Sequence, residues 1–121
     1  NDQLTLDEGE PFQYIVLSAG PGIPDEAGLL KDIIKTYAPT KCIFGVCLGL
    51  QAIGEVFGGT LVNLDQVYHG VATTITVTKD DPIFKGMSKN LQVGRYHSWV
   101  VDPKVPEVLE ITSVDENGQI M

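Results

Sequence analysis

Positive charge is scarce in this sequence: 8 Lys and Arg residues stand against 16 Asp and Glu residues, which gives a formal net charge of −8 at pH 7. This balance argues against a protein that binds nucleic acid or an anionic membrane surface. The sequence also has no apolar run close to the roughly 18 residues that a membrane-spanning helix needs, and it opens with no signal-peptide pattern. Its only two cysteines, Cys42 and Cys47, are too close along the chain for a disulfide framework, so we expect a reducing, cytoplasmic environment.

The composition that remains is that of a globular protein. Hydrophobic residues make up 43% and charged residues 20% of the 121 residues, which suits one domain, residues 1–121, with a single core. Two short apolar runs, at 13–18 and 41–46, predict buried strands. Apolar residues at helical spacing over 29–37, and the run 48–57 that ends at a pair of glycines, predict helices. Alternating strands and helices with fully apolar strands predict a parallel sheet covered on both faces.

The second half of the sequence is richer in strands. We expect strands at 71–78, 91–96 and 109–114, and a hairpin-type turn at 115–118. There are no internal repeats and no linker. These patterns predict an α/β fold with a strand-rich second half.

The first chemical motif is Gly45-Val46-Cys47-Leu48-Gly49, where the second expected strand meets the helix after it. A nucleophile on such a sharp turn needs small neighbours, because the turn is strained and crowded. The turn would place the Cys47 thiol at a helix N-terminus, where the helix dipole stabilises a thiolate. It would also direct the Leu48 N–H toward a developing oxyanion. The alternative is a tight turn that packs Cys47 as a small apolar side chain, and Cys42, inside the strand, is expected to be inert core.

A second motif, Gly20-Pro21-Gly22, follows the first expected strand. In a parallel sheet it lies at the same carboxyl edge as Cys47, which is where ligands bind in open α/β sheets. Its glycines would let backbone N–H groups approach a ligand without a Cβ in the way. An ordinary Gly-Pro turn is the alternative, and it explains the longer run SAGPGIP less well.

Four segments, LSAGPGIP, GVCLGLQAIGEVFGG, VYHG and GRYHSWVV, occur in this order along the chain. In order and spacing they resemble the class I (Cys-His-Glu) glutamine amidotransferase domain. More narrowly, they resemble the glutaminase component of anthranilate synthase and of aminodeoxychorismate synthase. The resemblance covers almost the whole chain, and it implies the three-layer, flavodoxin-like fold of that family with a mostly parallel sheet.

The resemblance also implies roles for individual residues. Cys47 would be the nucleophile, and backbone N–H groups of Leu48 and Gly20 would form the oxyanion hole. The residues that would bind glutamine are Gly20, Pro21, Gly22, Gln51, Ser98 and Trp99, the last two through their backbone at the amino-acid end of the substrate. His69 and His97 match two recurrent histidines that are not catalytic. Trp99 departs from the family, which usually has a smaller apolar residue there.

The implied enzyme hydrolyses L-glutamine through a cysteine thioester and passes ammonia to a synthase component I that aminates chorismate. Anthranilate synthase, in tryptophan biosynthesis, is the first expectation for that partner, and aminodeoxychorismate synthase, in folate biosynthesis, is the alternative. No metal or organic cofactor is implied. Two further alternatives are a different cysteine hydrolase of the dienelactone-hydrolase type and a catalytically incomplete module that only binds the synthase.

Both ends of the sequence differ from the family pattern. The family has a strand and helix before the point that corresponds to Asn1, and a His-Pro-Glu run beyond the point that corresponds to Met121. That run supplies the base and the carboxylate that orients it. We therefore expect a fragment truncated at both ends that is inactive as a glutaminase on its own.

Overall fold

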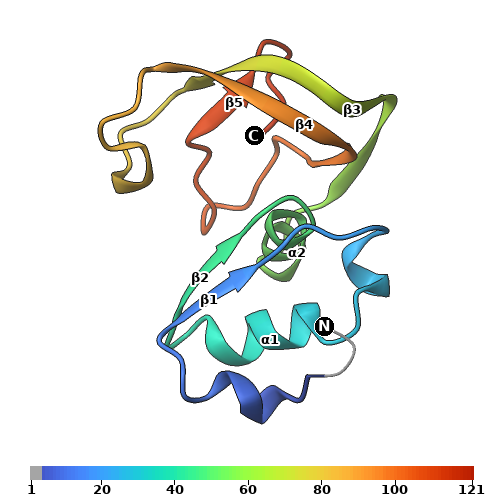
Figure 1. Ribbon diagram of the computed structural model, residues 1–121, viewed down its shortest axis with the longest axis vertical. Coiled ribbons are helices and arrows are strands. Elements are labelled where there is room, and N and C mark those ends of the chain that lie inside the picture. The colour runs from blue at the N-terminus through green and yellow to red at the C-terminus, as the bar shows by residue number, and fades with distance from the viewer. Residues whose placement is uncertain (1–3) are drawn as a thin grey trace. The chain divides into compact units, whose positions relative to one another are not determined.

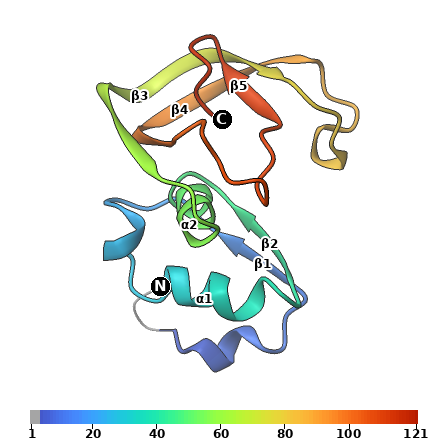
Figure 2. The same cartoon turned by 180° about the vertical axis from the view of Figure 1, so that it is seen from behind.

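The computed structural model describes residues 4–121, so the first three residues of the predicted domain lie outside the described residues. The chain divides into two compact units, Asn1–Gly58 and Gly59–Met121. Figure 1 and Figure 2 show the elements of each unit from opposite sides. Within the described residues, no helix is both long and apolar enough to cross a membrane.

The first unit combines a small parallel sheet with two helices. Strands β1 (Tyr14–Leu17) and β2 (Cys42–Gly45) pair in parallel, and each is followed by a helix, α1 (Leu30–Tyr37) or α2 (Leu48–Val56). The strand–helix alternation expected from the sequence is therefore confirmed. The core of this unit is one apolar cluster drawn from β1 and both helices: Leu17, Leu30, Ile34, Leu48 and Ala52.

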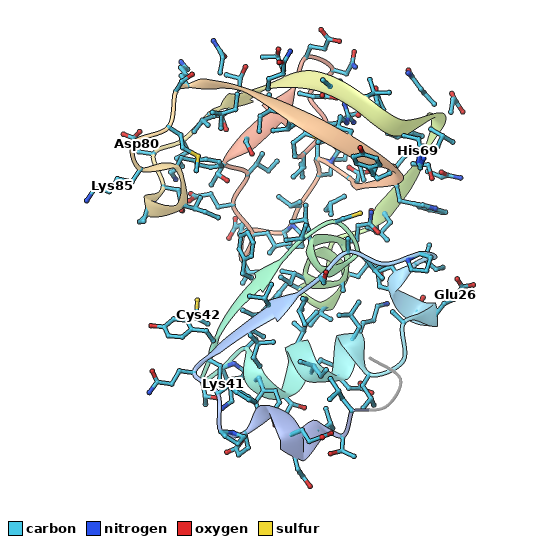
Figure 3. All side chains as sticks on the ribbon, in the orientation of Figure 1. Glu26, Lys41, Cys42, His69, Asp80 and Lys85 are labelled. Atoms are coloured by element: carbon cyan, nitrogen blue, oxygen red, sulfur yellow. The ribbon has the colours of Figure 1, made fainter. Side chains whose placement is uncertain are left out.

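Only one face of this sheet is covered within the described residues. Successive side chains of a strand point to opposite faces, so Ile15 and Leu17 pack on the core while Tyr14 and Val16 are 74% and 67% exposed. The expected cover on both faces is therefore absent from this part of the chain. Cys42 lies on the uncovered face and is exposed, and Figure 3 shows its sulfur directed away from β2. The prediction that Cys42 belongs to the core was wrong, because an apolar strand does not reveal which of its faces is covered.

The second unit is an antiparallel sheet. Its strands are β3 (Leu61–Val77), β4 (Asn90–Val101) and β5 (Ser113–Asp115), in the order β4-β3-β5. The described residues thus form a two-stranded parallel sheet and a three-stranded antiparallel sheet. For these residues, the expectation of a mostly parallel sheet does not hold.

The strand boundaries in the second unit differ from the expected ones. β3 begins ten residues before the expected 71 and β4 extends five residues past the expected 96. Most of the expected strand at 109–114 is irregular, and only its last two residues belong to β5. The turn at 115–118 is confirmed: Gly118 N–H donates to the Asp115 carbonyl at 3.1 Å, and Gly118 takes a φ of +77° that favours glycine.

Candidate active site

Cys47 occupies a strained turn between β2 and α2. Its φ of 52° and ψ of −104° make it the one non-glycine residue with a positive φ in the described part of the chain. Such a conformation costs on the order of 1–3 kcal/mol and persists where the surroundings enforce it, often at functional sites. The sharp strand-to-helix turn expected from the sequence is therefore present.

Two glycines make this turn possible. A Cβ on Gly45 would lie 2.5 Å from the Gly49 carbonyl carbon, and a Cβ on Gly49 would lie 2.7 Å from the Leu17 Cβ. Real Cβ atoms essentially never come this close to other atoms. The turn therefore packs closely against β1 at Gly49, and its two ends approach one another at Gly45. This is the crowding that the spacing of Gly45, Cys47 and Gly49 predicts.

The glycine loop after β1 lies beside the start of α2. A Cβ on Gly20 would be 3.0 Å from the Leu48 Cδ2, and Gly22 takes a φ of +76°. The first N–H groups of a helix have no acceptor within the helix and carry the positive end of its dipole. The structure therefore brings together the two residues, Gly20 and Leu48, whose N–H groups are expected to stabilise an oxyanion.

An ion-pair cluster connects the same loop to both helices. The loop continues into a short 3₁₀ turn, η2 (Pro24–Glu26). Lys31 Nζ, on α1, lies 2.5 Å from Asp25 Oδ1 in this turn and 2.6 Å from Glu55 Oε2 on α2. A hydrogen bond to Asp25 and, to a smaller extent, one to Glu55 raise the pKa of Lys31 above its ordinary value of 10.5. These contacts restrain the loop relative to α2, the helix that begins directly after the sharp turn at Cys47. We call this turn the elbow.

Gln51 lies on the first turn of α2. Its N–H donates to the Cys47 carbonyl at 3.0 Å, and the residue is only 5% exposed. A buried amide side chain needs hydrogen-bonding partners. The sequence-predicted residues Gly20, Pro21, Gly22, Cys47, Leu48 and Gln51 thus belong to the first unit, on adjoining segments.

The remaining predicted residues belong to the second unit. Ser98 and Trp99 are half-buried residues of β4. His69, in the middle of β3, is exposed, and its ring lies edge-on to the Tyr96 ring with the centroids 5.5 Å apart; Figure 3 labels it near the bend of this strand. His97 is half-buried, with hydrogen bonds at both ring nitrogens, as expected for a structural histidine.

A buried polar network around His97 was not foreseen from the sequence. Arg95, 2% exposed, donates to Asp115 Oδ2 at 2.7 Å, to Gln119 Oε1 at 2.7 Å and to His97 Nε2 at 3.0 Å. Its guanidinium also lies 3.6 Å from the centre of the Tyr68 ring. Burial lowers the pKa of His97 below 6.5, and the Arg95 charge acts in the same direction. Arginine at an alternating position of a strand resembles a solvent-exposed residue, so no sequence pattern indicated its burial.

Within the described residues, no group of three or more His, Cys, Asp and Glu side chains is placed to hold a metal ion. The family profile described as "Glutamine amidotransferase class-I" matches residues 1–121. The chain belongs to this family. Membership of this family is consistent with the strained turn at Cys47 and with the glycine loop beside it.

Among curated relatives of this amidotransferase, aminodeoxychorismate synthase component 2 of Escherichia coli is 43% identical over 124 residues, which cover all of this chain and 66% of that protein. Anthranilate synthase component 2 of Pseudomonas aeruginosa is 43% identical over 116 residues, which cover 93% of this chain and 57% of that protein. The chain thus spans about three fifths of the length of these relatives.

A solved structure shows the same fold. The crystal structure of a candidate GMP synthase protein from Thermoplasma acidophilum matches with a TM-score of 0.85 at 22% identity, over 99% of this chain and 60% of that one. The two chains have diverged far in sequence, so the match speaks for the α/β fold alone. The sequence-based identification of the family is confirmed.

Proposed function

We propose that this amidotransferase hydrolyses L-glutamine and delivers the ammonia to a synthase component that aminates chorismate. The observation that carries the proposal is the strained backbone of Cys47, between two glycines that nothing larger could replace. A cysteine used only for packing has no need of a φ of 52°, whereas a nucleophile gains exposure and a helix N-terminus from it. Family membership and component 2 relatives support the same function.

The proposed chemistry uses the residues to which the family resemblance assigns roles. The Cys47 thiolate attacks the side-chain carbonyl carbon of glutamine, and the N–H groups of Leu48 and Gly20 stabilise the oxyanion that forms. The C–N bond then breaks, ammonia leaves after protonation, and water hydrolyses the thioester to glutamate. Gly20, Pro21, Gly22 and Gln51 bind the substrate. The backbone of Ser98 and Trp99 binds its amino-acid end.

Neither histidine of the chain is proposed as the base. Both ring nitrogens of His97 are engaged, by Arg95 and by the Trp99 carbonyl, so that the ring has no vacant position for the thiol proton. The family resemblance assigns the base to a His-Pro-Glu run instead. The proposed domain extends over 1–121 and is one part of a three-layer fold, and the mechanism needs no metal or organic cofactor.

Anthranilate synthase component I is the proposed partner, with aminodeoxychorismate synthase component I as the alternative. The two relatives described above carry one name each at the same identity, so identity alone does not separate the two products. Purified component I of each kind, supplied with chorismate, glutamine and the full-length protein, separates them. The partner that yields product only when both proteins are present is the physiological one.

The elbow is tested by replacing its thiol. Cys47→Ser in the full-length protein is expected to abolish glutamine-dependent product formation, while synthesis from added ammonia by the partner continues. Cys42→Ser is the matched control, because Cys42 is an exposed cysteine on β2, and it should leave both activities near the wild-type level. Glutamine-dependent activity in Cys47→Ser would refute the proposed mechanism. A wild-type protein that binds the synthase but supports no glutamine-dependent synthesis would instead favour a module that serves only to bind the synthase.

A further inference from the structure

The β3–β4 ladder is interrupted opposite Ser98. Asn63 pairs with Trp99 and Tyr68 pairs with His97, so residues 64–67 of β3 all lie opposite Ser98 alone. An irregularity of this kind disrupts the ladder hydrogen bonds locally and is common beside active sites. The Ser98 segment therefore lacks the regular pairing that holds the rest of β4, and its conformation needs another restraint.

His97 supplies such a restraint. Its Nδ1 lies 3.0 Å from the Trp99 carbonyl oxygen, two residues along the same strand. Its Nε2 lies 3.0 Å from Arg95 Nε. Arginine has donors and no acceptor, so Nε2 must accept, and the ring proton of the neutral imidazole is on Nδ1. The Nδ1–H therefore donates to the Trp99 carbonyl, and this bond spans Ser98.

The ring itself is held through Arg95, which lies two residues earlier on the same strand. Arg95 pairs with Asp115 Oδ2 at 2.7 Å, and both residues are almost fully buried. Asp115 Oδ1 accepts the N–H groups of Asn117 and Gln119, each at 2.9 Å, which ties the ion pair to the turn after β5. The His97 ring also stacks on Tyr68, with centroids 5.7 Å apart and planes inclined by 23°. Position, tilt and tautomer of the ring are thus all determined by neighbours.

We propose that His97, held by the Arg95–Asp115 pair, is a positioning residue that fixes the Ser98–Trp99 backbone in the conformation that binds the amino-acid end of glutamine. This inference rests on the proposed function. His97 touches neither the reacting amide nor the Cys47 thiol in this role. Its loss therefore weakens recognition of the α-amino and α-carboxylate groups and leaves the attack of the thiolate on a bound electrophile unchanged.

Two substitutions of His97 each keep one of its two hydrogen bonds and remove the other. In His97→Asn the amide nitrogen falls near the former Nδ1 position and can still donate to the Trp99 carbonyl. In His97→Gln the amide lies near the former Nε2 position, where it can accept from Arg95 but does not reach the carbonyl. His69→Gln is the control, because His69 is an exposed histidine on the neighbouring strand.

The probe is 6-diazo-5-oxo-L-norleucine, a glutamine analogue with an electrophilic carbon beside the reacting carbonyl. Alkylation of Cys47 in the full-length protein is followed by mass spectrometry as a function of probe concentration, which gives a half-saturation constant and a maximal rate. His97→Gln should raise the half-saturation constant about tenfold, the equivalent of one lost hydrogen bond, at a nearly unchanged maximal rate. His97→Asn should stay within about threefold of wild type, and His69→Gln should equal it. Iodoacetamide, which has no amino-acid end, should react at the same rate with every variant.

The possible failures point to different causes. If alkylation of wild type is saturable and His97→Gln has the same half-saturation constant as wild type, the inference is overturned and the proposed function stands. Equal increases in His97→Asn and His97→Gln would also overturn it, because they would show a role in packing alone. An absence of saturable alkylation in wild type would overturn the proposed function itself. Should His97→Gln not fold, Gln119→Leu removes one acceptor of Arg95 and should raise the constant by about threefold; no rise overturns the inference.

Discussion

At the scale of single residues, Cys47 shows how function and stability oppose one another. Its backbone conformation is one that residues with L side chains rarely adopt, and the turn leaves no room for a Cβ at Gly45 or Gly49. Residues in such conformations cost stability that the rest of the structure must supply. The conformation is therefore expected to be kept for the exposure of the thiol.

A glycine at position 47 should remove this strain. Cys47→Gly is expected to be more stable than Cys47→Ala by about 1 kcal/mol, since relief of strain exceeds the entropy cost of glycine. Urea unfolding of the two full-length variants measures the difference. At Cys42, an ordinary strand position, the order should reverse, and Cys42→Gly should be less stable than Cys42→Ala by roughly 0.5–1 kcal/mol. A Cys47→Gly protein less stable than Cys47→Ala would show that the turn holds no strain at this residue.

At the scale of secondary structure, β4 and β5 depend on a charged pair rather than on apolar packing alone. The side chains of Arg95 and Asp115 are each 1% exposed, and the apolar residues buried with them in the second unit are few: Tyr68, Ile75, Val100 and Val101. A buried pair adds little net stability relative to apolar residues, but removing one partner leaves a buried charge without compensation.

Asp115→Asn should therefore be severely destabilising although it changes almost no volume. We expect a loss of about 3 kcal/mol in the free energy of unfolding, measured by urea denaturation of the full-length protein. The exposed pair between Lys79 and Glu110, whose side chains are 56% and 58% exposed, is the control. Glu110→Gln should cost less than about 1 kcal/mol. Similar losses in the two variants would mean that the buried pair is not what holds β5 in place.

The same elements show what could be predicted from the sequence. β1, β2, α1 and α2 lie within two residues of their expected bounds, because continuous apolar runs and terminating glycines or proline mark them clearly. The start of β3 was missed, since the polar residues of 61–70 and the two register shifts there break the two-residue alternation. The run at 109–112 has strand-like composition but no partner strand in the described residues, and pairing is not visible in composition.

The candidate site, too, could be predicted from the sequence only in part. The elbow and the glycine loop could be found from sequence, because local backbone geometry demands glycine at fixed positions around Cys47. The network of Arg95, His97 and Asp115 could not, because its members come from two strands, β4 and β5, that are separated in the chain. The roles assigned to Gln51 and to Ser98–Trp99 remain predictions.

At the scale of the whole molecule, the amidotransferase is proposed to act with a synthase. Glutamine hydrolysis without an acceptor would waste ammonia, so contact with the partner is expected to control the site. Residues 96–99 combine a proposed substrate contact, the Ser98–Trp99 backbone, with the aromatic side chains of Tyr96 and Trp99. Tyr96 is 65% exposed. Large exposed aromatic residues are frequent anchors of protein interfaces.

Tyr96→Ala in the full-length protein should therefore weaken binding to component I by roughly tenfold or more, the usual effect of losing an interface anchor. Hydrolysis of glutamine in the absence of the partner should change little, because the side chain has no proposed part in the chemistry. Tyr14→Ala is the matched control: Tyr14 is an equally large, 74% exposed tyrosine on β1, outside the proposed contact. Titration calorimetry gives the affinity, and glutaminase rates with and without component I give the coupling. If Tyr96→Ala binds and responds to the partner as Tyr14→Ala does, the interface lies elsewhere on the molecule.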